Sequence, residues 1–412
     1  MSNELRVIEL FSGIGSQRKA LNNLNKNHKV VAISEWDIPA LISYGAIFDS
    51  YKDPLYKEWS KKSLSEIKEK LSSKESWNFT NNGKRPLSNL NKISSTSLIK
   101  DYKNLPLEKK LLEKEKLEKE TALKLLVSSL VNNNLGDISK IDAKDIPDSD
   151  LITYSFPCQD LSLQGLQKGL KKGSSSSLLW EVKRILQELN KEDRLPSYLM
   201  MENVFAIFGE KHKSYFNEWK RFLKSIGYVN HDFLLTATDF NVPQNRKRAF
   251  MVSIKKELNQ EFNVPKGQFT KKRIKDIIEK DYDSKYIFDT QKYEIKNLNP
   301  DLNKNIIAKT KIDDFTTFTS EASAYSIKGI SPTITATGAL SRVKIILDDK
   351  VVRYYMPVEA WKLMGFTKTD FNKAASTKVV RENQLVKQAG NSIVVNVLEE
   401  IFKELFKDGK WN

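Results

Sequence analysis

Short apolar segments alternate with amphipathic helical segments along much of this chain. Five segments have the length and branched apolar content of buried strands: 5–11 (LRVIELF), 29–37 (KVVAISEWD), 150–156 (DLITYSF), 198–204 (YLMMENV) and 249–255 (AFMVSIK). Between them, residues 177–189 and 214–227 place apolar side chains at helical spacing. Strands that alternate with helices predict an α/β fold around a mainly parallel sheet.

Two regions depart from this rhythm. Residues 50–130 are polar and lysine-rich, and they include LEKKLLEKEKLEKETALKLLVSSLV at 107–131. This pattern predicts one or two charged helices in a solvated insertion within the first domain, 1–255. Residues 256–349 are basic and rich in Asn and Asp, and then in Thr and branched residues. They predict a second, smaller domain of irregular β structure.

The chain of 412 residues is long enough for two domains, and 40% hydrophobic residues suffice for a core. Its one cysteine, Cys158, excludes an internal disulfide and fits a reducing cytoplasm. No signal peptide and no run of eighteen apolar residues is present, so we expect a soluble intracellular protein. Three scattered histidines and one thiol cannot build a structural zinc site, and no metal is expected.

The net charge of +16 favours a polyanionic partner, because each neutralised phosphate releases a condensed counterion. A lysine-rich solubility surface would produce the same total. Charge alone therefore leaves both interpretations open, and the motifs must decide between them.

The first strand is followed by a glycine turn and a helix, in ELFSGIGSQRKAL. Gly13 and Gly15 resemble a dinucleotide fingerprint, but Arg18 occupies the position of its third glycine. The second strand ends in Glu35 and Trp36, which can hold a ribose and stack on adenine. Asp137, in GDI, could accept an adenine amino group. These features predict a nucleoside-bearing cofactor, and S-adenosylmethionine fits better than a dinucleotide because it has no phosphate.

Cys158 follows the strand 150–156, and a lone cysteine is usually a small buried hydrophobe. Two further strands are flanked by polar groups, Glu202–Asn203 in MMENV and the segment QNRKR at 244–248. Because ligand sites lie at the carboxyl ends of parallel strands, these groups and the thiol are expected to share one sheet edge. Each short motif alone is weak, but their joint occurrence in this order favours a reactive thiol.

The ordered blocks FSGIG, SEWD, GDI, SFPCQ, MENV, QNRKR, YMPVEAWKLMGF and QAGNSIVVNVLEEI resemble those of the DNA (cytosine-5)-methyltransferases. The resemblance covers most of the chain, and SFPCQDLSLQGLQKG with the insertion before it is most similar to the CpG-methylating enzymes of mollicutes. It implies a Rossmann-like catalytic domain at 1–255 and a target-recognition domain at 256–349. It also implies a C-terminal segment, 350–412, that returns to the catalytic domain.

The resemblance also implies the chemistry. Cys158 would add to C6 of a cytosine flipped out of duplex DNA, while Glu202 donates a hydrogen bond or proton at ring N3. Arg248 would hold the cytosine O2, supported by Arg246 and Asn203. The activated C5 would then take the methyl group of S-adenosylmethionine.

Further residues are implied position by position. The cofactor pocket would use Phe11, Gly13, Gly15, Glu35, Trp36, Asp137, Ile138, Pro157, Asn391 and Ser392. The residues facing DNA would be Gln164, which fills the vacated space in the helix, with Lys168, Lys171, Thr333, Thr337 and Arg342. The recognition loop would lie in PTITATGALSR at 332–342.

One departure from the family concerns the loop after Cys158. Most relatives carry Arg followed by a small residue where this chain has Ser175–Ser177. The arginine that would contact a phosphate is therefore missing, although Lys168, Lys171 and Lys172 could replace its charge. We expect slower or more salt-sensitive loop closure.

Several alternatives remain at this point. An RNA cytosine methyltransferase would use the same motifs, but the large basic region at 256–349 argues against it. A catalytically silent DNA-binding module conflicts with the intact Cys158, Glu202 and Arg248. Cytosine deamination is excluded because PCQD lacks the second cysteine of the deaminase motif. A nicotinamide dehydrogenase is disfavoured by the missing third glycine.

The expected target is CpG, with another short palindrome such as GATC as the alternative. We expect a monomer in the bacterial cytoplasm, associated with the nucleoid, with double-stranded DNA as its partner. A restriction-modification role with a cognate endonuclease and an orphan role are both compatible with the sequence.

Overall fold

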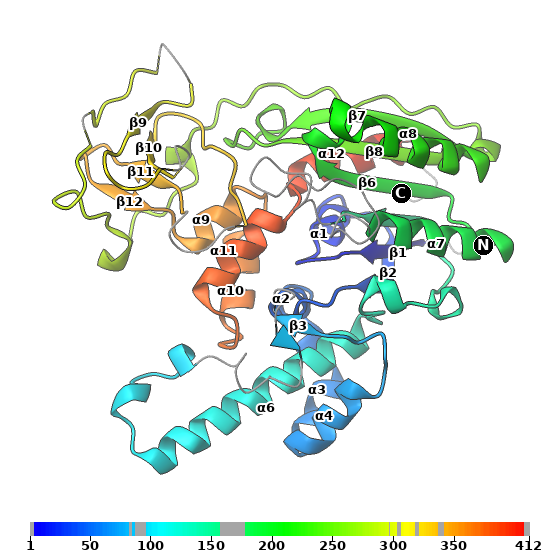
Figure 1. Cartoon of the computed structure of the whole chain (residues 1–412), viewed down its shortest axis with the longest axis horizontal. Helices are drawn as coiled ribbons and strands as arrows, with labels where there is room; N and C mark the ends of the chain where they lie inside the picture. The colour runs from blue at the N-terminus through cyan, green and yellow to red at the C-terminus, as the bar shows by residue number, and fades with distance from the viewer. Residues whose placement is uncertain are drawn as a thin grey trace.

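The computed structural model describes residues 4–81, 85–86, 96–156, 178–295, 297–302, 306–317, 321–336 and 342–407. Its larger part is built on a six-stranded sheet of order β2-β1-β5-β6-β8-β7. The strands are β1 (Leu5–Leu10), β2 (His28–Ser34), β5 (Leu151–Tyr154), β6 (Tyr198–Val204), β7 (Tyr228–Thr236) and β8 (Lys247–Lys255). Figure 1 shows this sheet between layers of helices.

The sheet is parallel from β2 through β1 and β5 to β6. Strand β8 runs antiparallel to both β6 and β7. The predicted mainly parallel α/β domain is therefore confirmed. Strand β7 was not among the predicted strands, because the polar residues Asn230, His231 and Asp232 interrupt its apolar run.

Helices cover both faces of the sheet, because alternate residues of each central strand are apolar on opposite sides. In β6, Met200 joins the core shared with α1 (Ser16–Asn23), α2 (Ile38–Ile47) and α12 (Val395–Leu405). The neighbouring Met201 joins the core under α7 (Leu178–Lys191) and α8 (Glu210–Ser225). The first four residues of β6, YLMM, are buried on both faces, which is why they form a continuous apolar run.

The region 50–130 is helical, as predicted, but it is not a solvated insertion. It contains α3 (Pro54–Ser60), α4 (Leu64–Ser72), the short strands β3 (Thr80–Asn81) and β4 (Arg85–Pro86), and one long helix, α6 (Leu107–Val131). The second half of α6 is buried, and Leu125, Leu126 and Val127 belong to the main core. The sequence did not reveal this burial, because many lysines occupy the other faces of the helix.

The first half of α6 projects away from the sheet (Figure 1), and its Leu107, Leu111 and Leu112 are exposed. The close approach of α6 to α2 depends on small residues. A Cβ added at Gly45 of α2 would lie 2.6 Å from the Ser128 hydroxyl of α6. Small side chains at this crossing let the two helices pack at short range.

The second, smaller sheet has the order β12-β11-β10-β9 and its own aromatic core around Phe288. Its strands are β9 (Lys309–Lys311), β10 (Ser323–Ser326), β11 (Lys344–Ile346) and β12 (Val352–Tyr354). A separate small β-rich unit was predicted, but the sheet extends past residue 349, because β12 pairs with β11.

Helices α9 (Pro357–Lys362), α10 (Lys368–Ala375) and α11 (Glu382–Asn391) lie between the two sheets (Figure 1). They contribute Trp361, Ala374 and Ala389 to the main core. Helix α12 then packs against α1, so the end of the chain closes the larger part of the molecule beside its first helix.

The two halves of α6 allow a matched test of its burial. Leu126→Ala should lower the free energy of unfolding by about 2–5 kcal/mol, because Leu126 is fully buried and its loss leaves a cavity. Leu111→Ala in the same helix should change it by less than about 0.5 kcal/mol, because Leu111 is 62% exposed. Urea unfolding followed by circular dichroism measures both. Equal effects of the two substitutions would contradict the burial of the second half of α6.

Candidate active site

The predicted polar groups converge at one edge of the main sheet, although not entirely as expected. Strands β1, β2, β5 and β6 end at this edge, and the antiparallel β8 begins there. The segment QNRKR thus lies at the amino end of an antiparallel strand, whereas the sequence argument placed it at a carboxyl end. The groups still come together, because the amino end of an antiparallel strand lies at the same edge of the sheet as the carboxyl ends of its parallel neighbours.

The pairing of β6 with β8 places Glu202 beside Arg248. Val204 lies opposite Arg248 in the register, and Glu202 is two residues before Val204 on the same face. The Arg248 Nε atom is 3.3 Å from Glu202 Oε1, and both side chains are largely buried. Burial raises the pKa of Glu202, while the charges of Arg248 and Arg246 act in the opposite direction. This carboxyl group is therefore suited to donate a proton or a hydrogen bond.

Asn203 fastens the end of β6 to the chain that leads toward Cys158. Its side-chain amide donates to the carbonyl of Phe156 at 3.1 Å, and its oxygen accepts from the Val204 N–H at 2.9 Å. Both ends of the buried amide are thus engaged with backbone. Asn203 is thus placed as a support of this edge, because it neighbours Glu202 and holds Phe156, which precedes Cys158 by two residues.

Several predicted residues lie outside the described part of the chain. They are Pro157, Cys158, Gln164, Lys168, Lys171 and Thr337, together with Lys172 and Ser175–Ser177. Phe156 is the last described residue before Cys158.

Arg246 is buried, and its guanidinium bonds backbone carbonyls from two other parts of the chain. It donates to the carbonyls of Ile334 at 2.9 Å, Gly390 at 3.0 Å and Ser392 at 2.8 Å. The sequence predicts that Arg246 supports Arg248 at a bound base. In the structure its contacts lie at the junction of the segment around Ile334 and the C-terminal segment.

The turn between β1 and α1 provides the first wall of the predicted cofactor pocket. Phe11, Gly13 and Gly15 all have positive φ, of 58°, 55° and 79°. A Cβ added at Gly15 would lie 2.4 Å from the Phe48 ring, whereas one at Gly13 would meet no atom within 4 Å. Gly15 thus packs against the protein, and Gly13 borders open space into which a ligand could fit.

Glu35 follows β2 at the same edge, and its carboxylate organises the surrounding backbone. It accepts from the N–H groups of Gly13 at 2.8 Å, Trp36 at 2.9 Å and Asp37 at 2.8 Å. Burial, and then the charge of Asp37, raise the pKa of Glu35 to about 7 against the opposing effect of these hydrogen bonds. Because a carboxylate has about four acceptor positions, Glu35 retains capacity for a further donor.

Asp137 and Ile138 lie where the chain passes the edge beside β2. The Asp137 carboxylate accepts from Ser139 N–H at 3.0 Å and from the Asn78 side-chain amide at 3.1 Å. Ile138 is buried. From the far end of the chain, the Ser392 hydroxyl lies 2.7 Å from that of Ser16 at the start of α1, while the neighbouring Asn391 is exposed.

Two residues of this edge were missed by sequence reasoning. Asn78 comes from the 50–130 region, which appeared to be an insertion remote from the site. Asn134 accepts from the N–H groups of Glu35 and Gly136 at 3.1 and 3.2 Å, and donates to the Glu35 carbonyl at 3.0 Å. The three asparagines at 132–134, shortly before GDI, were the one sequence signal that could have indicated a hydrogen-bonding side chain at this edge.

The two described residues predicted to face DNA both have partners within the protein. The Thr333 hydroxyl donates to the Asn245 carbonyl at 2.6 Å. Arg342 donates to Glu382 at 2.8 Å, and Lys285 holds the other oxygen of Glu382 at 2.9 Å. Thr333 and Arg342 therefore each have a hydrogen-bond partner in another part of the protein.

Within the described ranges, no group of three His, Cys, Asp or Glu side chains could hold a metal ion. Across the same ranges, no helix is both long enough and apolar enough to cross a membrane.

Comparison with known proteins identifies the class that this fold and site represent. The model of the C-5 cytosine-specific DNA methylases matches residues 113–407, more than two thirds of the chain. The protein therefore belongs to this family, and its enzyme class is that of the DNA cytosine-C5 methyltransferases.

Two full-length relatives are similar at the same level. The orphan methyltransferase M.SssI of Spiroplasma monobiae is 36% identical over 98% of each chain. The type II methyltransferase M2.ScrFI of Lactococcus lactis subsp. cremoris is 36% identical over 98% of this chain and 99% of its own. The predicted resemblance to the mollicute members of the family is confirmed.

Among solved structures, the Dnmt2 methyltransferase of S. pombe superimposes with a TM-score of 0.58 at 18% identity, over 98% of this chain and 99% of its own. A putative DNA modification methyltransferase encoded within an E. coli prophage superimposes with a TM-score of 0.52 at 18% identity, covering 98% and 99% of the two chains. At these identities the likeness supports the methyltransferase fold alone.

Proposed function

We propose that this protein transfers a methyl group from S-adenosylmethionine to C5 of a cytosine that has been flipped out of duplex DNA. The proposed route is a covalent adduct between Cys158 and C6 of the base. The observation that carries the proposal is the buried Glu202–Arg248 pair at the sheet edge, with Phe156 fastened beside it through Asn203.

The sequence supports the role of Cys158 as the nucleophile. Cys158 comes only two residues after Phe156, which Asn203 holds beside Glu202. A base that enters this space would meet a thiol, a protonatable carboxyl group and a guanidinium.

These three groups suffice to activate cytosine C5. The Cys158 thiolate forms a bond to C6, and the ring electrons move toward N3, where Glu202 supplies a hydrogen bond or a proton. Arg248 donates to the cytosine O2 and stabilises the same charge shift. After C5 has gained the methyl group, loss of the C5 proton to a base and expulsion of the thiolate restore the aromatic ring and the free enzyme.

The residues at the other end of the edge fit the proposed cofactor. Open space beside Gly13, the buried Glu35 carboxyl group and the Asp137 carboxylate match a nucleoside without a phosphate. S-adenosylmethionine would supply an electrophilic methyl group on its sulfonium. Glu35 would accept from the ribose hydroxyls, Trp36 would contact the adenine, and Asn391 and Ser392 would close the pocket from the C-terminal segment.

We assign target recognition to the smaller unit, residues 256–349, and its recognition loop to 332–342. CpG is the proposed target, because the catalytic segment resembles that of CpG-methylating enzymes and M.SssI is similar over the full chain. Another short palindrome such as GATC is the alternative, because recognition loops diverge while catalytic blocks persist. A tRNA substrate is the second alternative, and the experiments below separate it.

Cys158→Ser should abolish methylation of duplex DNA, by about 10⁴-fold or more, because a serine hydroxyl has far less of the reactive anion at neutral pH. Binding of S-adenosylmethionine and DNA should remain within about threefold. Wild-type protein should also form a covalent complex with a duplex containing 5-fluorocytosine, and the variant should not. Methyl-transfer assays and denaturing gels measure both effects.

Substantial turnover by Cys158→Ser would contradict the covalent route. The same assay with tRNA as the acceptor tests the RNA alternative, which is favoured if tRNA is methylated and duplex DNA is not. A wild-type protein that binds DNA but neither methylates it nor forms the fluorocytosine adduct would contradict the enzymatic function itself.

Affinity for S-adenosylmethionine should depend on pH through Glu35. With its pKa at about 7, the carboxyl group is mostly protonated at pH 6 and mostly ionised at pH 8. If only the ionised form accepts from the ribose, binding should be about tenfold weaker at pH 6 than at pH 8. Glu35→Gln should bind more weakly throughout and show no such dependence. Calorimetric titration across this range decides, and a flat wild-type profile would exclude this role.

Methylation of a plasmid in a host that otherwise lacks cytosine methylation should protect every CpG from bisulfite conversion and leave other cytosines converted. Sequencing of the converted plasmid measures this directly. Protection confined to a longer motif would replace CpG with that motif and leave the proposed chemistry unchanged.

A further inference from the structure

The segment that leads into the recognition loop is held by side chains from the QNRKR motif. Gln244 accepts from the Ile334 N–H at 2.9 Å, and Arg246 donates to the Ile334 carbonyl at 2.9 Å. Gln244 also donates to the Leu363 carbonyl at 2.7 Å. Both side chains are buried, so these hydrogen bonds satisfy polar groups that have lost their contact with water.

The same segment packs directly on the end of α11. A Cβ added at Gly390 would lie 2.3 Å from the Thr335 carbonyl oxygen and 2.4 Å from the Ala336 nitrogen. The absence of a side chain at Gly390 is therefore what allows this close backbone contact. Arg246 closes the junction from the other side, because it also donates to the carbonyls of Gly390 and Ser392.

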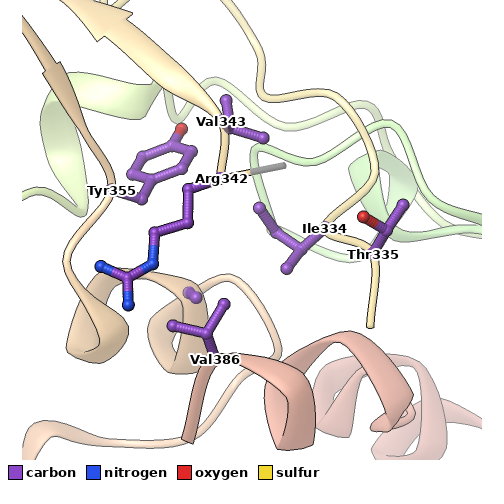
Figure 2. Close-up of a pocket in the computed structure, with 7 residues that line it drawn as sticks. Ile334, Thr335, Arg342, Val343, Tyr355 and Val386 are labelled. Carbon is purple, nitrogen blue, oxygen red and sulfur yellow. The ribbon is translucent and has the colours of Figure 1, made fainter. Parts of the chain in front are cut away.

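The described residues on either side of the proposed recognition loop, 332–336 and 342–343, are called the recognition segment here. Its second part is tied to the start of α11. Arg342 donates to Glu382 at 2.8 Å, and Lys285 donates to the second oxygen of the same carboxylate. Figure 2 shows the two ends, Ile334–Thr335 and Arg342–Val343, around a small pocket that Val386 of α11 also lines. This pocket holds only about 20 Å³, so the described residues Ile334 and Arg342 pack closely around Val386 of the helix.

Helix α11 therefore connects the recognition segment to the proposed cofactor pocket. It ends at Asn391, and the next residue, Ser392, lies 2.7 Å from the Ser16 hydroxyl at the start of α1. Ser16 directly follows the glycine turn that borders the open space beside Gly13. One guanidinium, that of Arg246, thus touches the backbone of both the recognition segment and the cofactor segment.

We propose that Arg246 is a positioning residue that couples duplex recognition to cofactor binding, and that it does so through Ile334, Gly390 and Ser392 rather than by contacting the flipped cytosine. The inference rests on the proposed function, because it takes duplex DNA and S-adenosylmethionine as the two ligands. A ligand that orders the 390–392 backbone also orders the Thr335–Ala336 backbone packed on it. The second ligand then loses less conformational freedom on binding, and each ligand strengthens the other.

The test compares the affinity for each ligand with and without the other. The probes are S-adenosylhomocysteine, which lacks the transferable methyl group, and a short duplex that the wild-type protein methylates. In the wild-type protein each should strengthen binding of the other by the same factor, at least about fivefold. Arg246→Lys should reduce this factor below about twofold, because one ammonium cannot donate to three carbonyls in the geometry of a guanidinium.

Gly390→Ala should lower the same coupling factor by a different route, because its methyl group pushes the Thr335 carbonyl away. Arg353→Lys is the matched control. Arg353 is a fully buried arginine paired with Glu359 at 2.7 Å, outside this junction, so its replacement should lower stability but keep the fivefold factor. Thermal unfolding of all three variants separates folding defects from loss of coupling.

A positioning role also predicts a split in the kinetics of Arg246→Lys. With both ligands saturating, the single-turnover methylation rate should fall by less than about tenfold, while the affinity coupling is lost. A large loss of rate with intact coupling would overturn the proposal and would indicate that Arg246 acts at the bound base. Wild-type coupling below twofold would also overturn it. Absence of methylation of any duplex by the wild-type protein would instead count against the proposed function, so the two failures are distinguishable.

Discussion

The antiparallel pairing of β8 with β6 is the constraint on which the site depends. A parallel strand in this place would have carried Arg246 and Arg248 to the opposite edge of the sheet, far from Glu202. The reversed strand puts its first residues beside the last residues of β6, and the two-residue period then sets Arg248 on the same face as Glu202. Strand β7, which pairs with β8 along its whole length, holds this arrangement from the outside.

Buried carboxyl groups mark both ends of this edge, and each is satisfied differently. Glu202 faces a guanidinium, whereas Glu35 accepts from backbone N–H groups of the turn that it helps to shape. Beneath them, the fully buried Glu9 accepts from the Arg18 N–H and the Tyr44 hydroxyl at 2.7 Å each, which fixes α1 under the glycine turn. Burial raises the pKa of all three. An edge built this way is preorganised, because its charges are oriented by the fold before any ligand arrives.

The two sheets share one structural unit through the C-terminal helices. The recognition segment is anchored at both ends to α11, and α11 runs directly into the residues beside α1. Under the proposed function, a duplex bound to the smaller unit and a nucleoside bound to the larger one would therefore both act on this helix.

The sequence by itself determined the alternation of strands and helices, the glycine turn and the approach of Glu202 to Arg248. Those features are local periodicities and ordered motifs, and they suffice to predict an α/β fold with polar groups gathered at one edge of its sheet. The sequence did not determine the direction of β8 or the burial of the second half of α6. The tertiary structure also decided that Asn78 and Asn134 support the sheet edge at Asp137 and Glu35. It likewise decided that Arg246 donates to backbone carbonyls and that Arg342 pairs with Glu382. A charged or amide side chain chooses its partner from groups far along the chain, and only the folded arrangement brings those groups within hydrogen-bond distance.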